Sequence, residues 1–123
     1  HCKGGKAEGV VEFVDIYPTL CELCGMSVPD SQLQGKSFVP ILQDSGKRTK
    51  EYAFVQWKDG YNIVSEKYSS TIWLRGDSVV ARMMFDRQSD AAENENKAST
   101  ESLCKEFEKQ EVQIKMKKLR LEK

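Results

Sequence analysis

The apolar residues of this chain follow two patterns, one with helical spacing and one that alternates along strands. The helical pattern begins at Asp15, an N-cap residue whose carboxylate can accept hydrogen bonds from the free N–H groups of a first helical turn. Pro18 falls in that first turn, where its missing N–H costs nothing. Two leucines three residues apart follow, and Gly25 stands where a left-handed C-cap is expected. The pattern predicts a helix over residues 15–24.

The alternating pattern occupies the middle of the chain and is rich in aromatic and β-branched residues. Turn signals separate its runs, notably Lys58-Asp59-Gly60 and Arg75-Gly76-Asp77. Just before it, residues 37–42 are apolar enough for one or two helical turns. We therefore predict a four-stranded antiparallel meander with strands over residues 52–57, 61–67, 69–74 and 78–86.

Helical spacing returns near the end of the chain, after Ser99 or Thr100 as a cap. The expected apolar stripe consists of Leu103, Phe107, Ile114 and Leu121, broadened by Val112, Met116 and Leu119. Such a stripe could bind a partner, but covering the chain's own sheet is the preferred interpretation. The whole pattern predicts an α+β fold, in which a four-stranded antiparallel sheet is packed by a C-terminal helix and preceded by one or two short helices.

Composition limits the classes of partner. The 123 residues carry a formal net charge of zero, with 31% charged residues, so no global field favours nucleic acid or a membrane surface. No apolar run approaches the roughly 20 residues that span a bilayer. We expect neither a nucleic-acid nor a membrane partner. Because the chain begins with His1 and not Met, we expect a fragment or a processed product.

The four cysteines include a C-x-x-C pair, Cys21 and Cys24, which is a pattern used by metal and redox sites. A zinc site would need two further ligands, and only His1, Cys2 and Cys104 remain to supply them. A redox pair usually opens a helix, where the helix N-terminus lowers the thiol pKa, whereas this pair falls in the last predicted turn. We predict free cysteines buried on a packed helix face, and no metal site.

Residues 11–25, VEFVDIYPTLCELCG, closely resemble the V-E-x-V-D-I-x-P-T-L-x-x-x-x-G segment of the sulfatase family, the formylglycine-dependent sulfuric ester hydrolases. Four later segments resemble the same family in the same order. They are similar to L-Q-G-x-S-x-x-P-L-L, to a strand ending in S-Q-Y, to the hairpin G-Y-S-I-R-T-D-x-Y-R-Y-T-x-W of the iduronate-2-sulfatase-like branch, and to L-Y-D-x-x-x-D-P-x-E-x-x-N. In this chain they are residues 33–42, 51–57, 60–73 and 84–96, the last through Phe85, Asp86, Asp90, Glu93 and Asn96. By this resemblance the chain looks like the C-terminal part of a sulfatase.

The resemblance implies a place within a larger enzyme of the alkaline-phosphatase-like superfamily. In that family a large N-terminal domain carries calcium and the formylglycine whose hydrated aldehyde attacks sulfate, and a smaller C-terminal subdomain carries a four-stranded sheet and a helix. The resemblance assigns residues 1–51, with the helix 15–24 and a connector, to the end of the main domain, and residues 52–123 to the C-terminal subdomain. The implied partners are the missing N-terminal sulfatase domain and a sulfated carbohydrate substrate. The implied location is periplasmic, secreted or lysosomal.

The catalytic chemistry of the family is missing from these residues. No C/S-x-P-x-R string occurs, and His1 is the only histidine. Carboxylates at Asp90, Glu93 and Glu95 resemble a calcium site superficially, but they match the family's C-terminal turn. We assign no catalytic residue and no metal ligand to this chain, place calcium and formylglycine in the missing domain, and predict that the chain alone does not hydrolyse sulfate esters.

A share of substrate recognition could remain at Gln56, Trp57 and Lys58, because the family's C-terminal subdomain borders the mouth of the active site. Trp57 offers an aromatic plane to a sugar ring, and Lys58 offers a cation to sulfate or carboxylate. The alternative is that Trp57 fills the core between sheet and helix. The family's Arg after G-Y-S-I is Val64 here, which removes one cation. The competing functional hypothesis is a non-catalytic binding or assembly module derived from a truncated sulfatase.

Overall fold

The computed structural model describes residues 4–28, 33–76, 78–100, 105, 108–109 and 111–116. The chain forms two compact units, residues 1–53 and 54–123, and each is described by itself. Among the described residues, no helix combines the length and the apolar character that crossing a bilayer requires.

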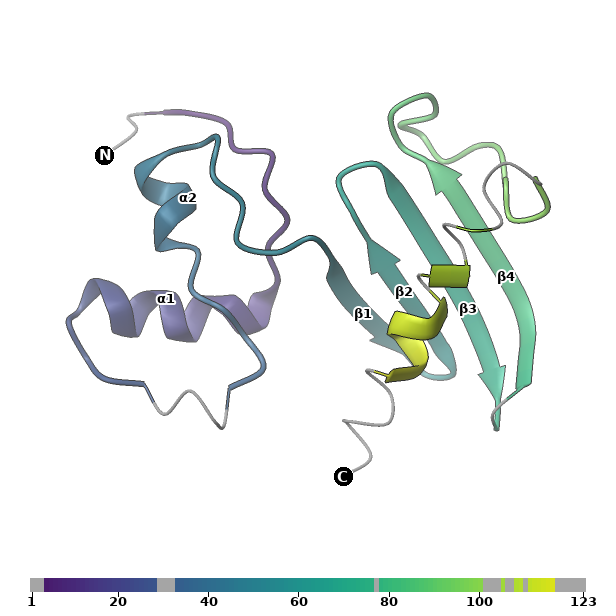
Figure 1. The fold of residues 1–123 in the computed structure, drawn as a ribbon, viewed down its shortest axis with the longest axis horizontal. Helices are drawn as coiled ribbons and strands as arrows, with labels where there is room; N and C mark the ends of the chain where they lie inside the picture. Colours follow the sequence, from purple (N-terminus) through teal and green to yellow (C-terminus); the bar gives the residue numbers. More distant parts are fainter. Residues whose placement is uncertain are drawn as a thin grey trace. The chain divides into compact units, whose positions relative to one another are not determined.

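The first unit contains a 3-10 turn and two helices, which are η1 (Phe13–Asp15), α1 (Ile16–Leu23) and α2 (Val39–Gln43) (Figure 1). The end of α1 matches the sequence expectation. Gly25 adopts a left-handed φ of 68° and donates its N–H to Glu22 O, while Met26 donates to Cys21 O. These two hydrogen bonds form a Schellman motif, which satisfies carbonyls that the helix end leaves without partners.

The start of α1 differs from the sequence expectation. Asp15 has helical dihedral angles, φ −81° and ψ −17°, and its side chain makes no capping hydrogen bond to the first turn of α1. Because η1 precedes the helix, the Asp15 carboxylate turns back and accepts the N–H of Glu12. The prediction of Asp15 as an N-cap of this helix was therefore wrong in its hydrogen-bond partners.

The second unit is built on the predicted sheet. Its strands are β1 (Ala53–Trp57), β2 (Gly60–Val64), β3 (Tyr68–Arg75) and β4 (Ser78–Asp86), in the order β1-β2-β3-β4. β2 pairs antiparallel with β3, and β3 pairs antiparallel with β4. The register places Tyr61 opposite Ile72 and Ser70 opposite Met84. The predicted antiparallel meander is confirmed.

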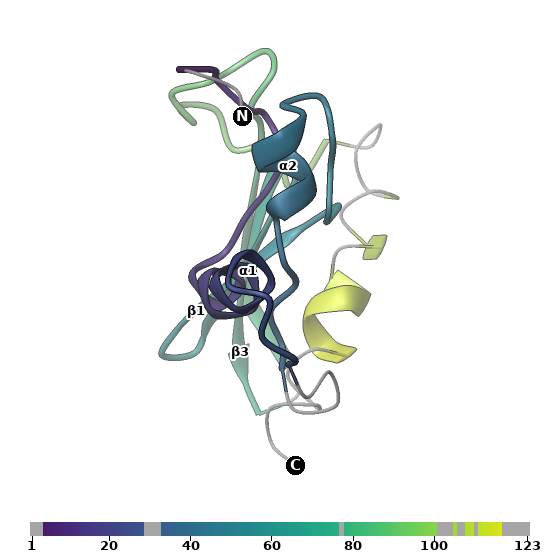
Figure 2. The same cartoon turned by 90° about the vertical axis from the view of Figure 1, so that its left-hand side faces the viewer.

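One face of the sheet is covered by the C-terminal helical turns, and we call it the covered face. Residues 111–116 are helical and lie on one side of the sheet in both views (Figures 1 and 2). Ile114 is fully buried, as are Ile72 and Met84 of the strands. Every second residue of β2 and β3, together with Met84 of β4, completes this core, which contains Tyr61, Ile63, Ser70, Ile72, Leu74 and Met84.

The predicted helical stripe is confirmed only at Ile114. Val112 and Met116 are about half exposed, so their assignment to the packed stripe was wrong. Each lies two positions from Ile114, which is about 200° around a helix and points away from the sheet. The other predicted members of the stripe, Leu103, Phe107, Leu119 and Leu121, lie outside the described residues.

Candidate functional site

The first family-like segment and the second meet at the carboxylate of Asp15. This side chain is fully buried, and its Oδ1 accepts the N–H of Lys36, in the L-Q-G-K-S segment, at 2.8 Å. Its Oδ2 accepts the N–H of Glu12 at 2.8 Å, and Lys50 Nζ donates to Oδ1 at 2.5 Å. Lys50 also pairs with the carboxylate of Glu12. Through these bonds the carboxylate connects the three segments of this unit that contain Glu12, Lys36 and Lys50.

Thr19 and Gly35 complete this joint. Thr19 Oγ1 donates to Asp15 O at 2.6 Å and accepts the N–H of Phe38 at 3.0 Å. A Cβ on Gly35 would lie 1.9 Å from Val14 O, so any side chain there would collide with backbone. The V-D-I-x-P-T and L-Q-G-x-S resemblances therefore correspond to one structural joint between α1 and the segment that leads to α2.

The charges in this joint shift each other's proton affinity. Burial raises the pKa of Asp15, but the hydrogen bonds from Lys50 and from the N–H groups of Lys36 and Glu12 outweigh it and hold that pKa below its usual value. Burial likewise lowers the pKa of Lys50, but the carboxylates of Asp15 and Glu12 outweigh it and raise that pKa. Both groups are held in their charged forms, as expected of a structural ion pair.

The last family-like segment also has a structural role. Asp90 accepts the N–H of Glu95 at 2.8 Å and the side-chain amide of Asn94 at 3.2 Å. The hydrogen bond from the Glu95 N–H holds the pKa of Asp90 below its usual value. Asn96 Oδ1 accepts the N–H of Met84 at 3.0 Å, which ties the loop to β4. These side chains shape the loop after β4, and Glu93 lies 3.8 Å from Arg87.

The C-x-x-C pair and the carboxylates after β4 are the candidates for a metal site in the sequence. Within the described part of the chain, no group of three or more His, Cys, Asp or Glu residues could hold a metal ion. Cys21 is buried and Cys24 is exposed, and both are free thiols. The prediction that both members of the pair are buried was therefore wrong for Cys24, which is the C-cap residue of α1. Cys2 and Cys104 lie outside the described residues.

The three rim residues do not share one surface. Phe54 and Gln56 are on the covered face, because the Phe54 ring lies 6.2 Å from the Tyr61 ring and Gln56 Nε2 donates to Tyr61 Oη at 3.4 Å. Since side chains alternate along a strand, Val55 and Trp57 point to the opposite side, which we call the open face. Trp57 is 76% exposed, so the alternative that it fills the core between sheet and helix was wrong.

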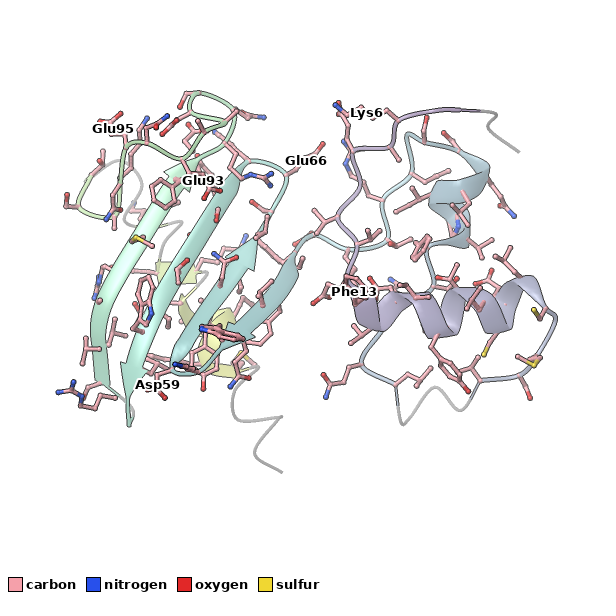
Figure 3. All side chains as sticks on the ribbon, turned by 180° about the vertical axis from the view of Figure 1, so that it is seen from behind. Lys6, Phe13, Asp59, Glu66, Glu93 and Glu95 are labelled. Atoms are coloured by element: carbon pink, nitrogen blue, oxygen red, sulfur yellow. The ribbon has the colours of Figure 1, made fainter. Side chains whose placement is uncertain are left out.

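Lys58 follows Trp57 at the tip of the β1–β2 hairpin and adopts a left-handed φ of 52°. Figure 3 shows the neighbouring Asp59 at this end of the sheet, while Glu66, Glu93 and Glu95 lie at the opposite end. Trp57 and Lys58 therefore adjoin each other at the hairpin tip, away from the labelled glutamates, and Gln56 faces the other side.

A large apolar surface runs along α1, which sequence reasoning did not single out. Four α1 side chains lie within an arc of about 120° at 3.6 residues per turn, and Phe13 lies one turn earlier. All five are exposed, Phe13 by 92%. Phe13 is labelled at the start of α1 in Figure 3. We call this surface the α1 stripe; its members are Phe13, Ile16, Tyr17, Leu20 and Leu23.

The comparisons with known proteins identify similar sequences and folds. No protein-family model matches the chain. The chain is 29% identical over 94 residues to a Delta 4,5-hexuronate-2-O-sulfatase of Bacteroides thetaiotaomicron, a match that covers 69% of this chain and 19% of that protein.

Solved structures share the fold. A sulfatase from Bacteroides thetaiotaomicron superimposes with a TM-score of 0.68 at 23% identity, covering 86% of this chain and 24% of that one. A sulfatase from Bacteroides fragilis gives a TM-score of 0.71 at 21% identity, covering 90% of this chain and 25% of that one. A protein solved with its substrate, D-glucosamine-2-N,6-O-disulfate, gives a TM-score of 0.67 at 21% identity, covering 84% of this chain and 23% of that one.

The chain thus spans about a fifth to a quarter of the length of the relatives that it matches. The sequence match and the shared fold confirm the resemblance that the five ordered segments indicated. This chain is similar to sulfatases, and its fold is that of their C-terminal part, including the four-stranded antiparallel sheet.

Proposed function

We propose that this chain is the C-terminal portion of a sulfatase that hydrolyses sulfate esters of sulfated carbohydrates. Its relatives include a hexuronate-2-O-sulfatase and a protein solved with a disulfated glucosamine, which supports a sulfated sugar as substrate. The chain completes the fold and contributes to the pocket rim, and it does not supply the nucleophile. Residues 1–51 are the end of the main domain, and residues 52–123 are the C-terminal subdomain.

The α1 stripe is the observation that carries this proposal. Exposed apolar surfaces of this extent mark interaction sites, since monomeric proteins rarely leave them in water. Here the stripe occupies most of one helix face, while the opposite side of α1 buries Pro18, Thr19 and Cys21. The occupant that we propose is the missing N-terminal sulfatase domain. The chain covers only 24% of the solved sulfatase that it matches, so a large part of that fold lies outside it.

As part of the same proposal, calcium and formylglycine belong to the missing domain. The described residues offer no group of His, Cys, Asp and Glu for a metal ion, and the whole sequence lacks C/S-x-P-x-R. We therefore derive no catalytic step in this chain. Of the rim residues, we propose Trp57 and Lys58 as contacts for a sugar, because both are exposed, whereas Gln56 faces the other side of the sheet.

Reading the gene upstream of His1 tests this proposal directly. An open frame that continues upstream and encodes C/S-x-P-x-R with clustered Asp and Asn residues is the expected result. A start codon immediately before His1, with no such domain encoded nearby, would overturn it and favour a non-catalytic binding or assembly module.

A protein-level test uses the stripe itself. The isolated chain should self-associate and bind an apolar dye, and the double variant Ile16→Lys, Leu20→Lys should be monomeric and bind little dye. A matched control is Val80→Lys, another exposed apolar residue, which lies on β4 and outside the stripe. A wild-type chain that is monomeric and dye-free would contradict a docking role for the stripe.

A further inference from the structure

Both tryptophans of the chain lie on the open face of the sheet, at the end that carries the β1–β2 hairpin turn, which we call the hairpin end. The register places Trp73 of β3 opposite Gly60 of β2. A Cβ on Gly60 would lie 3.0 Å from Trp73 Nε1 and 3.2 Å from Trp57 O, so the Trp73 indole extends over the glycine. Gly60 follows Trp57 across the hairpin turn, and it offers no side chain that could separate the two indoles.

The two indoles do not stack on one another in the way that Phe54 and Tyr61 approach each other. They belong to strands β1 and β3, whose backbones are about 10 Å apart because β2 runs between them. Trp57 is strongly exposed, and Trp73 is half-buried because it lies against the glycine. The hairpin end of the open face therefore presents a broad aromatic surface.

A row of polar groups continues the same face away from the tip. Asn62 Nδ2 donates to Thr71 Oγ1 at 2.8 Å and to Ser69 Oγ at 3.2 Å. Both hydroxyl oxygens accept in these bonds, so the Thr71 hydroxyl hydrogen and the amide oxygen of half-buried Asn62 are not used by them, while Ser69 is itself buried. Neighbouring donors and acceptors beside an aromatic surface suit a ligand with many hydroxyl groups, and they suit an apolar protein surface poorly.

Charged residues of both signs belong to this end: Lys58 is followed in the sequence by Asp59, and Arg75 by Gly76 and Asp77. Lys58 lies at the tip of the β1–β2 hairpin, and Arg75 is the last residue of β3, opposite Ser78; both are exposed. The β3–β4 register shifts between Trp73 and Leu74, and along β3 itself Arg75 lies two positions after Trp73, on the same side as Trp73. Asp59 is also at this end, and the labelled glutamates of the sheet unit lie at the opposite end (Figure 3). Two cations near two indoles offer partners for a sulfate or a carboxylate, while the indoles offer apolar planes to sugar rings.

We propose that the hairpin end of the open face is a binding site for an anionic carbohydrate, formed by Trp57, Trp73, Lys58 and Arg75 with the Asn62 row beside them. The site rests on the proposed function for its ligand class, sulfated or uronate-containing sugar. It differs from the three-residue rim expected from the sequence, because Gln56 is excluded and β3 supplies half of the site. It holds the glycan chain, and no bond of the substrate is broken there.

Tryptophan fluorescence tests the site without added labels, since both tryptophans of the chain belong to it. The probe is a sulfated heparin tetrasaccharide, titrated into the 123-residue chain at low ionic strength, with the desulfated tetrasaccharide as comparison. We expect a saturable change in emission with the sulfated probe and at least roughly tenfold weaker binding of the desulfated one. Added salt should weaken the sulfated complex, because exposed charges are screened.

Single variants measure how much each residue of the site contributes to binding. Trp57→Ala should weaken binding roughly tenfold when measured by calorimetry, whereas Trp57→Phe should keep most of the affinity because it keeps a ring. Lys58→Gln and Arg75→Gln should each weaken binding of the sulfated probe more than binding of the desulfated one, which keeps only its carboxylates. Phe13→Ala is the matched control, since Phe13 is an equally exposed aromatic residue of the other unit. It should leave binding unchanged.

The outcomes separate this inference from the proposed function. Binding that Trp57→Ala weakens roughly tenfold, and that Phe13→Ala leaves unchanged, supports the site even if no sulfatase domain is encoded upstream. Binding that is absent, or that Phe13→Ala weakens as much as Trp57→Ala, overturns it. A third outcome uses the chain joined to its N-terminal domain. If that protein is an active sulfatase, but the emission of Trp57 and Trp73 is blue-shifted and insensitive to the probe, the open face is a domain interface. The inference then fails and the proposed function stands.

Discussion

Replacing Asp15 by alanine should destabilise the first unit strongly. The carboxylate is fully buried and accepts two backbone N–H groups and the Lys50 ammonium. Its loss leaves these donors without their acceptor and leaves Lys50 with Glu12 alone. Breaking a buried ion pair by removing one partner costs about 3–5 kcal/mol, a large share of the typical stability of a domain. We expect Asp15→Ala to lower the opening free energy of α1 by this amount or to remove its protection completely.

Native-state hydrogen exchange of single amides measures this effect where it occurs. The amide of Cys24, which donates to Leu20 O, reports α1, and the amide of Leu74 in the sheet unit is the internal reference. Asp44→Ala is the matched control. Asp44 is exposed and its carboxylate accepts one backbone N–H, from Gly46 at 2.9 Å, so loss of the carboxylate should cost about 0.5–1 kcal/mol.

The variants also test the coupling to Lys50. The double variant Asp15→Ala, Lys50→Met should lose less stability than the sum of the two single variants, because the second change removes a charge that the first left poorly paired. If Asp15→Ala costs no more than Asp44→Ala, or if the two changes at Asp15 and Lys50 are additive, the account of this joint is wrong.

Three further expectations follow from the same structure. The folded-state pKa of Asp15 lies below its ordinary value of 3.8, so the stability that the ionised carboxylate contributes is complete above about that pH and is lost as the pH falls through the lower folded value. In Asp15→Asn, the exchange protection of α1 should therefore depend less on pH in the acid range. An unchanged acid profile would refute this. Gly35→Ala should destabilise the same unit by about 2 kcal/mol or more in chemical denaturation, whereas Gly46→Ala, whose Cβ would meet only Asp44 Oδ1 at 3.3 Å, should be nearly neutral; equal effects would contradict the close approach to Val14 O. In a variant with Cys2 and Cys104 replaced by serine, a maleimide should modify Cys24 in the native state and Cys21 only after unfolding, and equal native rates would contradict their burial.

The sheet was predictable because its signals are local. Alternation within each run and the turn residues between runs define antiparallel neighbours that follow one another in the chain. The left-handed φ of Gly25 was predictable for the same reason, since only the helix that it ends is involved. The family resemblance then supplied the place of this sheet in a larger fold.

The sequence patterns did not indicate which residues far away in the chain are hydrogen-bonded to one another. The donors to Asp15 include Lys36 and Lys50, which lie 21 and 35 residues away, and nothing near Asp15 indicates them. The N-cap rule therefore identified an important residue and assigned it the wrong partners. Alternation placed Val55 and Trp57 on one side of β1, but it could not decide which side the C-terminal helix covers, and so it left Trp57 between a core role and an exposed one.

The candidate site was predictable in part. Trp57 and Lys58 were recognised from an aromatic residue and a cation at a turn. Trp73 and Arg75, the other two residues of the site that we propose, were not candidates in the sequence, because only the register that sets Trp73 opposite Gly60 relates β3 to the β1–β2 hairpin. The signal that could have found them is the glycine opposite Trp73, since a strand glycine often marks a close approach by another group.

The most direct test of the account is a desulfation assay on a sulfated hexuronate disaccharide with three proteins. These are the 123-residue chain alone, the chain extended by its upstream coding sequence, and the upstream portion without the chain. The account predicts activity only for the extended protein, with both parts inactive when separate. Desulfation by the 123-residue chain alone, or full activity of the upstream portion without it, would contradict the claim that this chain completes a sulfatase whose reactive groups lie elsewhere.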